Sequence, residues 1–156
     1  MNTLSIWNKL ANMPAGKWLF SQVLCLKAPY FGTISPRFVE LTQGYCKISF
    51  AKRRGVLNHI GTVHAIAMCN AAELAGGTMT EVTVPSTHRW IPKAMQVEYL
   101  KPGKSNLVVV ATPEGDLPLD EAGAYLVNVA ITDSQSELVF KAQITMWISP
   151  KKSIAT

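Results

Sequence analysis

The feature that most constrains the fold is a segment of small and apolar residues from Gly61 to Gly77. A helix that begins at Gly61–Thr62 and continues through this segment presents almost no polar side chain to water, so it has to be buried. The pair Gly76–Gly77 supplies the residue type that commonly ends a helix. We therefore predict one long buried helix over residues 62–76.

The few polar residues of this segment need partners if the helix is buried. They are His64, Asn70 and Glu73, preceded by Asn58 and His59. His64 and Glu73 are nine residues apart, which on an α-helix is roughly 180° around the axis and about 13 Å along it. The two side chains cannot share one pocket on one helix. A two-fold dimer has a self-complementary interface, so it would bring Glu73 of one chain to the helix start of the other.

Four residues of this region carry a resemblance to a known family. Asn58, Gly61, His64 and Glu73 match a pattern of Asn, Gly three residues on, His six on and an acidic residue fifteen on. This pattern resembles the central helix of hotdog-fold acyl-CoA thioesterases of the PaaI-like group. In layout the chain is similar to an uncharacterised thioesterase-like branch (DUF4442-like). The resemblance covers about residues 44–148 and implies an α+β hotdog fold, with an antiparallel sheet wrapped around one long central helix.

The resemblance also implies a chemistry. A thioester carbonyl needs a hydrogen-bond donor where negative charge develops, and the first N–H groups of a helix are unpaired. The backbone at Gly61 and Ala65 corresponds to the family's oxyanion site, with the Ala65 N–H as donor, and Asn58 and His64 would hold the thioester or the leaving group. Glu73 of the partner chain would be the base or the nucleophile. Its apolar neighbours would disfavour the charged form and make it a better base.

Two positions depart from the family pattern. The family commonly has Gly-Gly after the histidine, whereas this chain has Ala65–Ile66, and Ile66 would narrow the pocket. Some relatives place a Ser or Thr near the start of the following strand to position a water. That place falls near Pro92, so the polar group is missing or has moved to Ser86, Thr87 or Lys93.

Each candidate residue also has a structural interpretation that needs no chemistry. Asn58 would shape the turn and cap the helix. His64 would be hydrogen-bonded inside the core. Glu73 would form a salt bridge with Arg89 or Lys93, because a carboxylate is rarely left without a partner in so apolar a helix.

Length and composition fit a single domain over residues 1–156, with an N-terminal helical extension at 1–36 and a core at 44–148. A chain of 156 residues that is 48% hydrophobic can bury a core of its own. Only 16% of its residues are charged, which favours further burial in a homodimer or tetramer.

The net charge of +5 is concentrated around the predicted helix. These basic residues form either an ordinary solvated surface or a rim that binds the phosphates of coenzyme A, with Arg54, Arg89 and Lys93 as substrate contacts. Nucleic acid is not an expected partner, because the basic residues are not interleaved with stacking aromatics and no binding motif is present.

The cysteines and histidines argue against a metal site. Cys25, Cys46 and Cys69 are odd in number and contain no CxxC, which is typical of core residues in a reducing cytoplasm. The three histidines lack metal-ligand spacing. We expect a cytoplasmic protein with no metal and no cofactor apart from the coenzyme A that belongs to the substrate.

The remaining elements are predicted from periodicity. Residues 4–12 and 15–26 are expected to be helices that pack on the domain, since they are too short to span a bilayer; an interfacial membrane helix is the less favoured alternative. The segments with alternating or β-branched residues predict strands at 44–54, 78–84, 94–100, 105–112, 124–132 and 137–148. Turn residues at 102–104 and 133–136 predict that the strands on either side of each turn pair antiparallel.

Three functions follow from these interpretations. The first is an acyl-CoA thioesterase that hydrolyses a medium-chain or aromatic acyl thioester at a site shared by a dimer. The second is a non-catalytic module that binds acyl-CoA or an acyl-carrier protein, favoured by Ala65–Ile66 and the missing hydroxyl. The third, a dehydratase of the same fold, ranks last because the histidine segment of that branch is absent.

Overall fold

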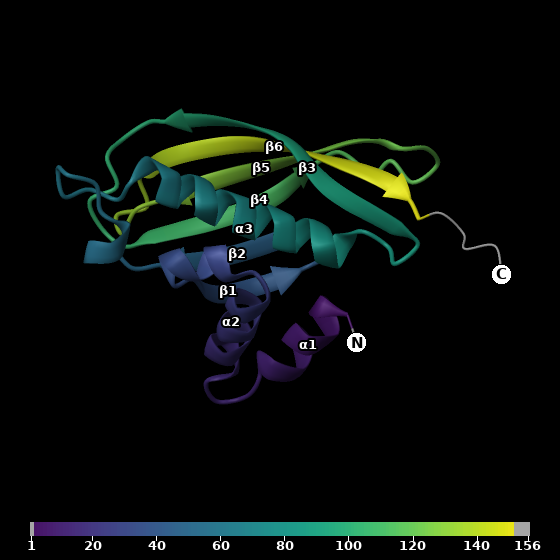
Figure 1. Ribbon diagram of the computed structural model, residues 1–156, viewed down its shortest axis with the longest axis horizontal. Coiled ribbons are helices and arrows are strands. Elements are labelled where there is room, and N and C mark those ends of the chain that lie inside the picture. Colours follow the sequence, from purple (N-terminus) through teal and green to yellow (C-terminus); the bar gives the residue numbers. More distant parts are fainter. Residues whose placement is uncertain (1, 152–156) are drawn as a thin grey trace.

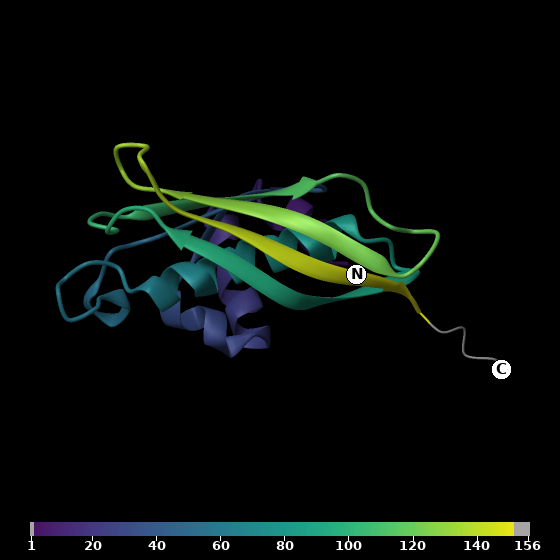
Figure 2. The ribbon, with the colours of Figure 1, turned by 90° about the horizontal axis from the view of Figure 1, so that it is seen from above.

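The computed structural model describes residues 2–151 and consists of a curved six-stranded antiparallel sheet with one long helix, α3 (Ala65–Thr83), against its concave face (Figures 1 and 2). The spatial order is β1-β2-β4-β5-β6-β3, so β1 and β3 are the two edges. The strands are β1 (Arg37–Thr42), β2 (Tyr45–Phe50), β3 (His88–Tyr99), β4 (Leu107–Glu114), β5 (Gly123–Thr132) and β6 (Leu138–Pro150). The expected α+β architecture, a sheet around one central helix, is confirmed.

Helix α3 is displaced toward the C-terminus relative to the prediction. It begins at Ala65 and continues through the two glycines to Thr83, so the strand predicted at 78–84 is wrong. The β-branched residues of that segment stay helical because much of it is buried, and tertiary packing overrides weak local preferences. The Thr80 hydroxyl donates to the Gly76 carbonyl at 2.8 Å, and the Thr83 hydroxyl donates to the Met79 carbonyl at 2.6 Å.

The two glycines allow close packing of α3 and do not end it. A Cβ atom at Gly76 would lie 2.9 Å from the Cδ1 atom of Ile144 on β6. A Cβ atom at Gly77 would lie 3.2 Å from the Trp90 ring on β3. Residues without a side chain therefore let the helix approach the sheet at the position where the sequence predicted a helix stop.

The N-terminal segment forms two helices, α1 (Thr3–Leu10) and α2 (Gly16–Lys27), and the 3-10 helix η1 (Pro29–Ile34). The predictions of helices at 4–12 and 15–26 are confirmed. Both helices lie next to β1 (Figure 1), where Phe20 packs edge-on against Trp7 and Phe38 with ring centroids 5.1 Å apart in each pair. The Phe38 N–H donates to the Ser21 hydroxyl at 3.0 Å. Within residues 2–151, no helix is long and apolar enough to cross a membrane.

One of the two predicted turns does not connect paired strands. The strands on either side of residues 102–104 are separated in the sheet, since β3 pairs with β6 while β4 lies between β2 and β5. The segment after β3 instead contacts the approach to α3, where the Val63 N–H donates to the Gly103 carbonyl at 2.8 Å. The other prediction is confirmed, because β5 and β6 pair antiparallel across residues 133–136.

Candidate functional site

The loop before α3 is organised by the side chain of Asn58. Its Oδ1 atom accepts hydrogen bonds from the N–H groups of Ile60 and Thr62, each at 3.1 Å, and its Nδ2 group donates to the Thr62 hydroxyl at 2.8 Å. Gly61 has φ +78°, and its N–H donates to the Asn58 carbonyl at 3.1 Å. Asn58 therefore shapes the turn, and the Gly61 N–H is already paired.

His64 is the N-cap of α3. Its extended backbone (φ −63°, ψ 137°) suits this position, and its Nδ1 atom accepts the Ile66 N–H at 3.1 Å. The side chain is exposed, so the expectation of a core histidine is wrong. With Nδ1 as acceptor, the neutral ring carries its proton on Nε2. The N–H of Ala65 has no hydrogen-bond partner among residues 2–151, as expected of the first residue of a helix.

Asn70 connects α3 to the N-terminal segment. Its side chain is only 6% exposed, and its Nδ2 group donates to the Thr33 hydroxyl at 3.0 Å and to the Tyr30 carbonyl at 3.4 Å. Its Oδ1 atom is buried and has no partner in the described part of the chain. Asn70 lies with His64 and Ile66 on a small cavity of about 190 Å³. The hydrogen-bond partners expected for a buried Asn70 are thus provided by η1.

Glu73 is exposed in the single chain, in contrast to the buried setting expected from its apolar neighbours. Among residues 2–151 it forms no hydrogen bond and no salt bridge, so the pairing with Arg89 or Lys93 is absent from the described structure. It lies on the wall of an apolar groove of about 450 Å³, which we call the α2–α3 groove. The groove is lined by Thr3, Ile6, Phe20, Val23, Leu24, Lys27, Ala28, Phe31, Glu73, Leu74, Gly77, Thr78, Glu81, Trp90 and Pro92.

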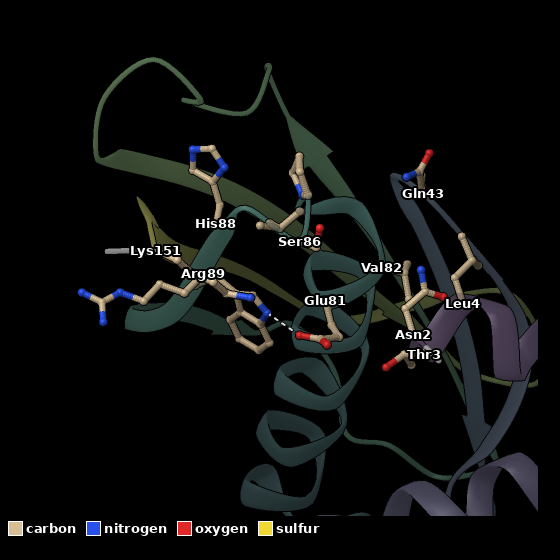
Figure 3. A pocket seen from close by; sticks show the side chains of 13 residues that line it. Asn2, Thr3, Leu4, Gln43, Glu81, Val82, Ser86, His88, Arg89 and Lys151 are labelled. Carbon is tan, nitrogen blue, oxygen red and sulfur yellow. Dashed lines mark hydrogen bonds between the residues drawn. The ribbon is translucent and has the colours of Figure 1, made fainter. Parts of the chain in front are cut away.

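A hydrogen bond between Glu81 and Trp90 bounds this groove toward the C-terminus of α3. The indole N–H of Trp90 donates to a carboxylate oxygen of Glu81 at 2.8 Å (Figure 3). Both residues also line a second, more polar cleft of about 580 Å³. In Figure 3 the Arg89 side chain extends away from Glu81. The Glu81–Trp90 pair thus separates the apolar groove from the polar cleft.

The basic candidates do not gather around one site. Lys93 is the extra residue of a bulge in β3, and its ammonium group lies 3.6 Å from the centroid of the Trp147 ring. The Arg89 Nε–H donates to the Ser149 hydroxyl at 3.1 Å. Ser149 and Trp147 alternate with the buried residues of β6, so Arg89 and Lys93 lie on the sheet face opposite α3. Arg54 is exposed in the short 3-10 helix η2 (Arg54–Val56), before the loop that leads to α3.

The residues expected to replace the family's water-positioning Ser or Thr also lie far from His64. Ser86 and Thr87 lie in the turn after the C-terminus of α3, and the Thr87 hydroxyl forms a hydrogen bond with Nδ1 of His88 at 2.9 Å. One chain therefore brings His64, Ala65 and Ile66 together at one end of α3. It places Glu73 nine residues further along, and the other polar candidates beyond it.

A contact between Cys69 and Tyr99 places β3 beside the exposed side of α3. The two side chains are 3.1 Å apart, and this hydrogen bond together with burial raises the pKa of Tyr99 to about 12. Trp90 contacts Glu81 near the other end of the helix. The edge strand β3 thus runs along α3 in the opposite direction, past Glu73.

The comparisons with known proteins are consistent with this geometry. Residues 16–148 match the family described as "Domain of unknown function (DUF4442)". The chain belongs to the DUF4442 family. A crystal structure designated genomics APC5556 is 43% identical, covers 96% of this chain and 98% of its own, and has a TM-score of 0.82. A search of curated proteins found no match.

More distant structures establish the fold of this DUF4442 protein. Thioesterase HI1161 from Haemophilus influenzae is 12% identical over 86% of this chain and 91% of its own, with a TM-score of 0.74. The protein smu.793 from Streptococcus mutans UA159, solved bound to acetyl CoA, is 20% identical to this chain, with a TM-score of 0.64. The match covers 74% of this chain and 90% of the smu.793 chain. The hotdog fold and the DUF4442-like branch expected from the sequence are confirmed.

Proposed function

We propose that this DUF4442 protein is an acyl-CoA thioesterase whose active sites are each built by two chains. The observation that carries the proposal is the position of Glu73, an exposed carboxylate on an apolar groove, beside an edge strand and without a partner in the described chain. An unpaired carboxylate in such a place suits a reaction that needs a base or a nucleophile. The hotdog-fold neighbours, one named a thioesterase and one bound to acetyl CoA, support the same reaction class.

The dimer follows from the free edge of the sheet. Strand β3 extends over His88–Tyr99 and has no neighbour on its outer side, and Ile91 within it is 59% exposed. A second copy that pairs its own β3 there would extend the sheet across a two-fold axis. The two α3 helices would then lie antiparallel on the same face, so that Glu73 of one chain faces the start of α3 in the other.

In this arrangement the helix start and the carboxylate act on the same thioester. Glu73 takes a proton from water, and the resulting hydroxide adds to the thioester carbonyl carbon. The negative charge on the carbonyl oxygen is stabilised by the unpaired Ala65 N–H of the other chain and by the positive end of its helix. When the carbon–sulfur bond breaks, the thiolate of coenzyme A takes a proton from Glu73. Direct attack by Glu73, followed by hydrolysis of the anhydride, is the second route.

His64, Asn58 and Arg54 have supporting roles in this proposal. The Nε2–H of His64 can donate to the thioester while Nδ1 caps the helix, and Asn58 holds the loop that sets the position of His64. Arg54 lies at the same end of α3 as a contact for the phosphates of coenzyme A. The reaction as written needs no cofactor beyond the coenzyme A of the substrate. Free Cys25, Cys46 and Cys69 support a cytoplasmic location.

Hydrolysis of a panel of acyl-CoA esters tests the reaction. Glu73→Gln keeps the size of the side chain and removes the base, so we expect a loss of kcat of at least about a hundredfold. Substrate binding without hydrolysis by the unmodified protein would instead support the alternative, a non-catalytic acyl-thioester binding module. That alternative is favoured by the exposed Ile66 beside His64 and by the hydrogen bonds that both polar atoms of the Asn58 side chain form within its own loop.

Mixing two inactive variants tests the shared site. In a mixed dimer of Glu73→Gln and His64→Ala chains, one site combines both intact residues and the other has neither. Random exchange should therefore restore about one quarter of the activity. No recovery despite subunit exchange, verified by native mass spectrometry, would show that each site lies within one chain.

A further inference from the structure

The α2–α3 groove has the chemistry of a site for an extended apolar chain with a reactive head. Its apolar side chains come from both walls, with Ile6, Val23 and Phe31 on one side and Leu74 on the other. Lys27 and the two glutamates are its charged lining residues. Glu81 accepts a hydrogen bond from Trp90. Of the two groove carboxylates, Glu73 is therefore the one without a partner among the described residues.

We propose that the acyl tail of the substrate lies in this groove, with the thioester at Glu73, so that the N-terminal helices select the length of the chain. The proposal rests on the thioesterase function proposed above and adds the substrate class, a straight medium-length acyl chain. A tail placed here would be covered by α1, α2 and η1 on one side and by α3 and β3 on the other, which removes it from water.

The length of the groove gives the expected chain length. Glu73 and Glu81 mark the two ends of its α3 wall and are eight residues apart, which is about 12 Å of helix. Because a carbon–carbon bond of about 1.5 Å advances a zigzag chain by roughly 1.25 Å, this distance accommodates about nine or ten carbons. A longer chain would meet the Glu81–Trp90 hydrogen bond and the polar cleft beyond it.

The test uses S-alkyl-coenzyme A thioethers, which have no carbonyl and cannot be hydrolysed. Their affinity for the full-length protein, measured by calorimetry, should rise about fourfold per added methylene. The increase should stop near the C9–C10 length derived from the helix. Val23 is 46% exposed on the groove wall, so Val23→Trp can fill the groove without overpacking the core. This variant should bind short-chain thioethers normally and lose at least tenfold in affinity for the ten-carbon thioether.

Leu26→Trp is the matched control, since Leu26 lies on the same helix, is 82% exposed and is not part of the groove lining. Its affinities should not change. Should Val23→Trp fail to fold, Ile6→Ala removes contacts that α1 contributes to the same wall and should weaken the binding of long chains only. Affinity that is independent of chain length, or that Leu26→Trp lowers as much as Val23→Trp, would overturn the proposal.

The outcomes also separate this inference from the proposed reaction. Binding that depends on chain length and on Val23, without hydrolysis of any acyl-CoA, supports the groove and rejects the hydrolase. Hydrolysis that requires Glu73 and proceeds equally for all chain lengths supports the hydrolase and rejects the groove as the acyl site.

Discussion

His64 is expected to have two separable roles, one in the stability of α3 and one in the proposed reaction. Its Nδ1 atom accepts the Ile66 N–H at 3.1 Å, and the rest of the ring is exposed. His64→Ala therefore removes one capping hydrogen bond and little buried surface, which costs about 1 kcal/mol. For a domain of this size that corresponds to a decrease in Tm of about 2–4 °C.

His64→Asn restores a side-chain acceptor at the cap and lacks the imidazole N–H. We expect its Tm, measured by differential scanning calorimetry, to return to the unmodified value, while acyl-CoA hydrolysis stays as low as in His64→Ala. An unchanged Tm in His64→Ala would refute the capping argument. Hydrolysis that recovers together with Tm in His64→Asn would show that the histidine acts on the reaction only by capping the helix.

Three further predictions concern the dimer edge, the N-terminal segment and β3. Ile91→Glu on the free edge of β3 should give a monomer in native mass spectrometry and abolish hydrolysis, whereas Val39→Glu, exposed on the opposite edge strand, should change neither. Asn70→Asp removes both donors to η1 and places a carboxylate in a buried site, so it should lower the free energy of unfolding, measured with urea, by more than about 2 kcal/mol. Cys69→Ala should return the pKa of Tyr99 from about 12 toward 10.0 in a spectrophotometric alkaline titration. Because the folded-state pKa is raised, the contribution of Tyr99 to stability is present below pH 10 and lost as the pH rises through about 12.

The fold could be predicted because its main elements leave strong local patterns. The largely apolar segment around α3 predicted a buried helix, and alternation predicted β5 and β6 closely. The pairing of β3 could not be deduced, because the turn residues at 102–104 are equally compatible with a hairpin and with a longer crossing. The strand prediction for residues 78–84 was wrong because β-branched residues favour strands locally, while burial against the sheet keeps this segment helical.

The roles of the candidate site residues stay predictions, and the structure corrects what the sequence indicated about their surroundings, since His64 and Glu73 are both exposed. Spacing alone indicated that His64 and Glu73 lie far apart on one helix, and α3 separates them in this way. The sequence does not reveal that Asn58 uses both polar atoms of its side chain in its own loop. It also gave no sign of the α2–α3 groove, since the walls of that groove are distant in the sequence and meet only through tertiary packing.

The division of the α2–α3 groove between two parts of the chain links ligand binding to conformational stability. One wall belongs to α1, α2 and η1, which rest on the domain through the aromatic contacts of Phe20 and the hydrogen bonds of Asn70. A ligand that fills the groove adds contacts to both walls. Its binding free energy therefore stabilises the state in which α1, α2 and η1 are packed on the domain, relative to a state in which they are detached. Protease resistance of the first helices should accordingly increase with ligand concentration, even in a variant that performs no chemistry.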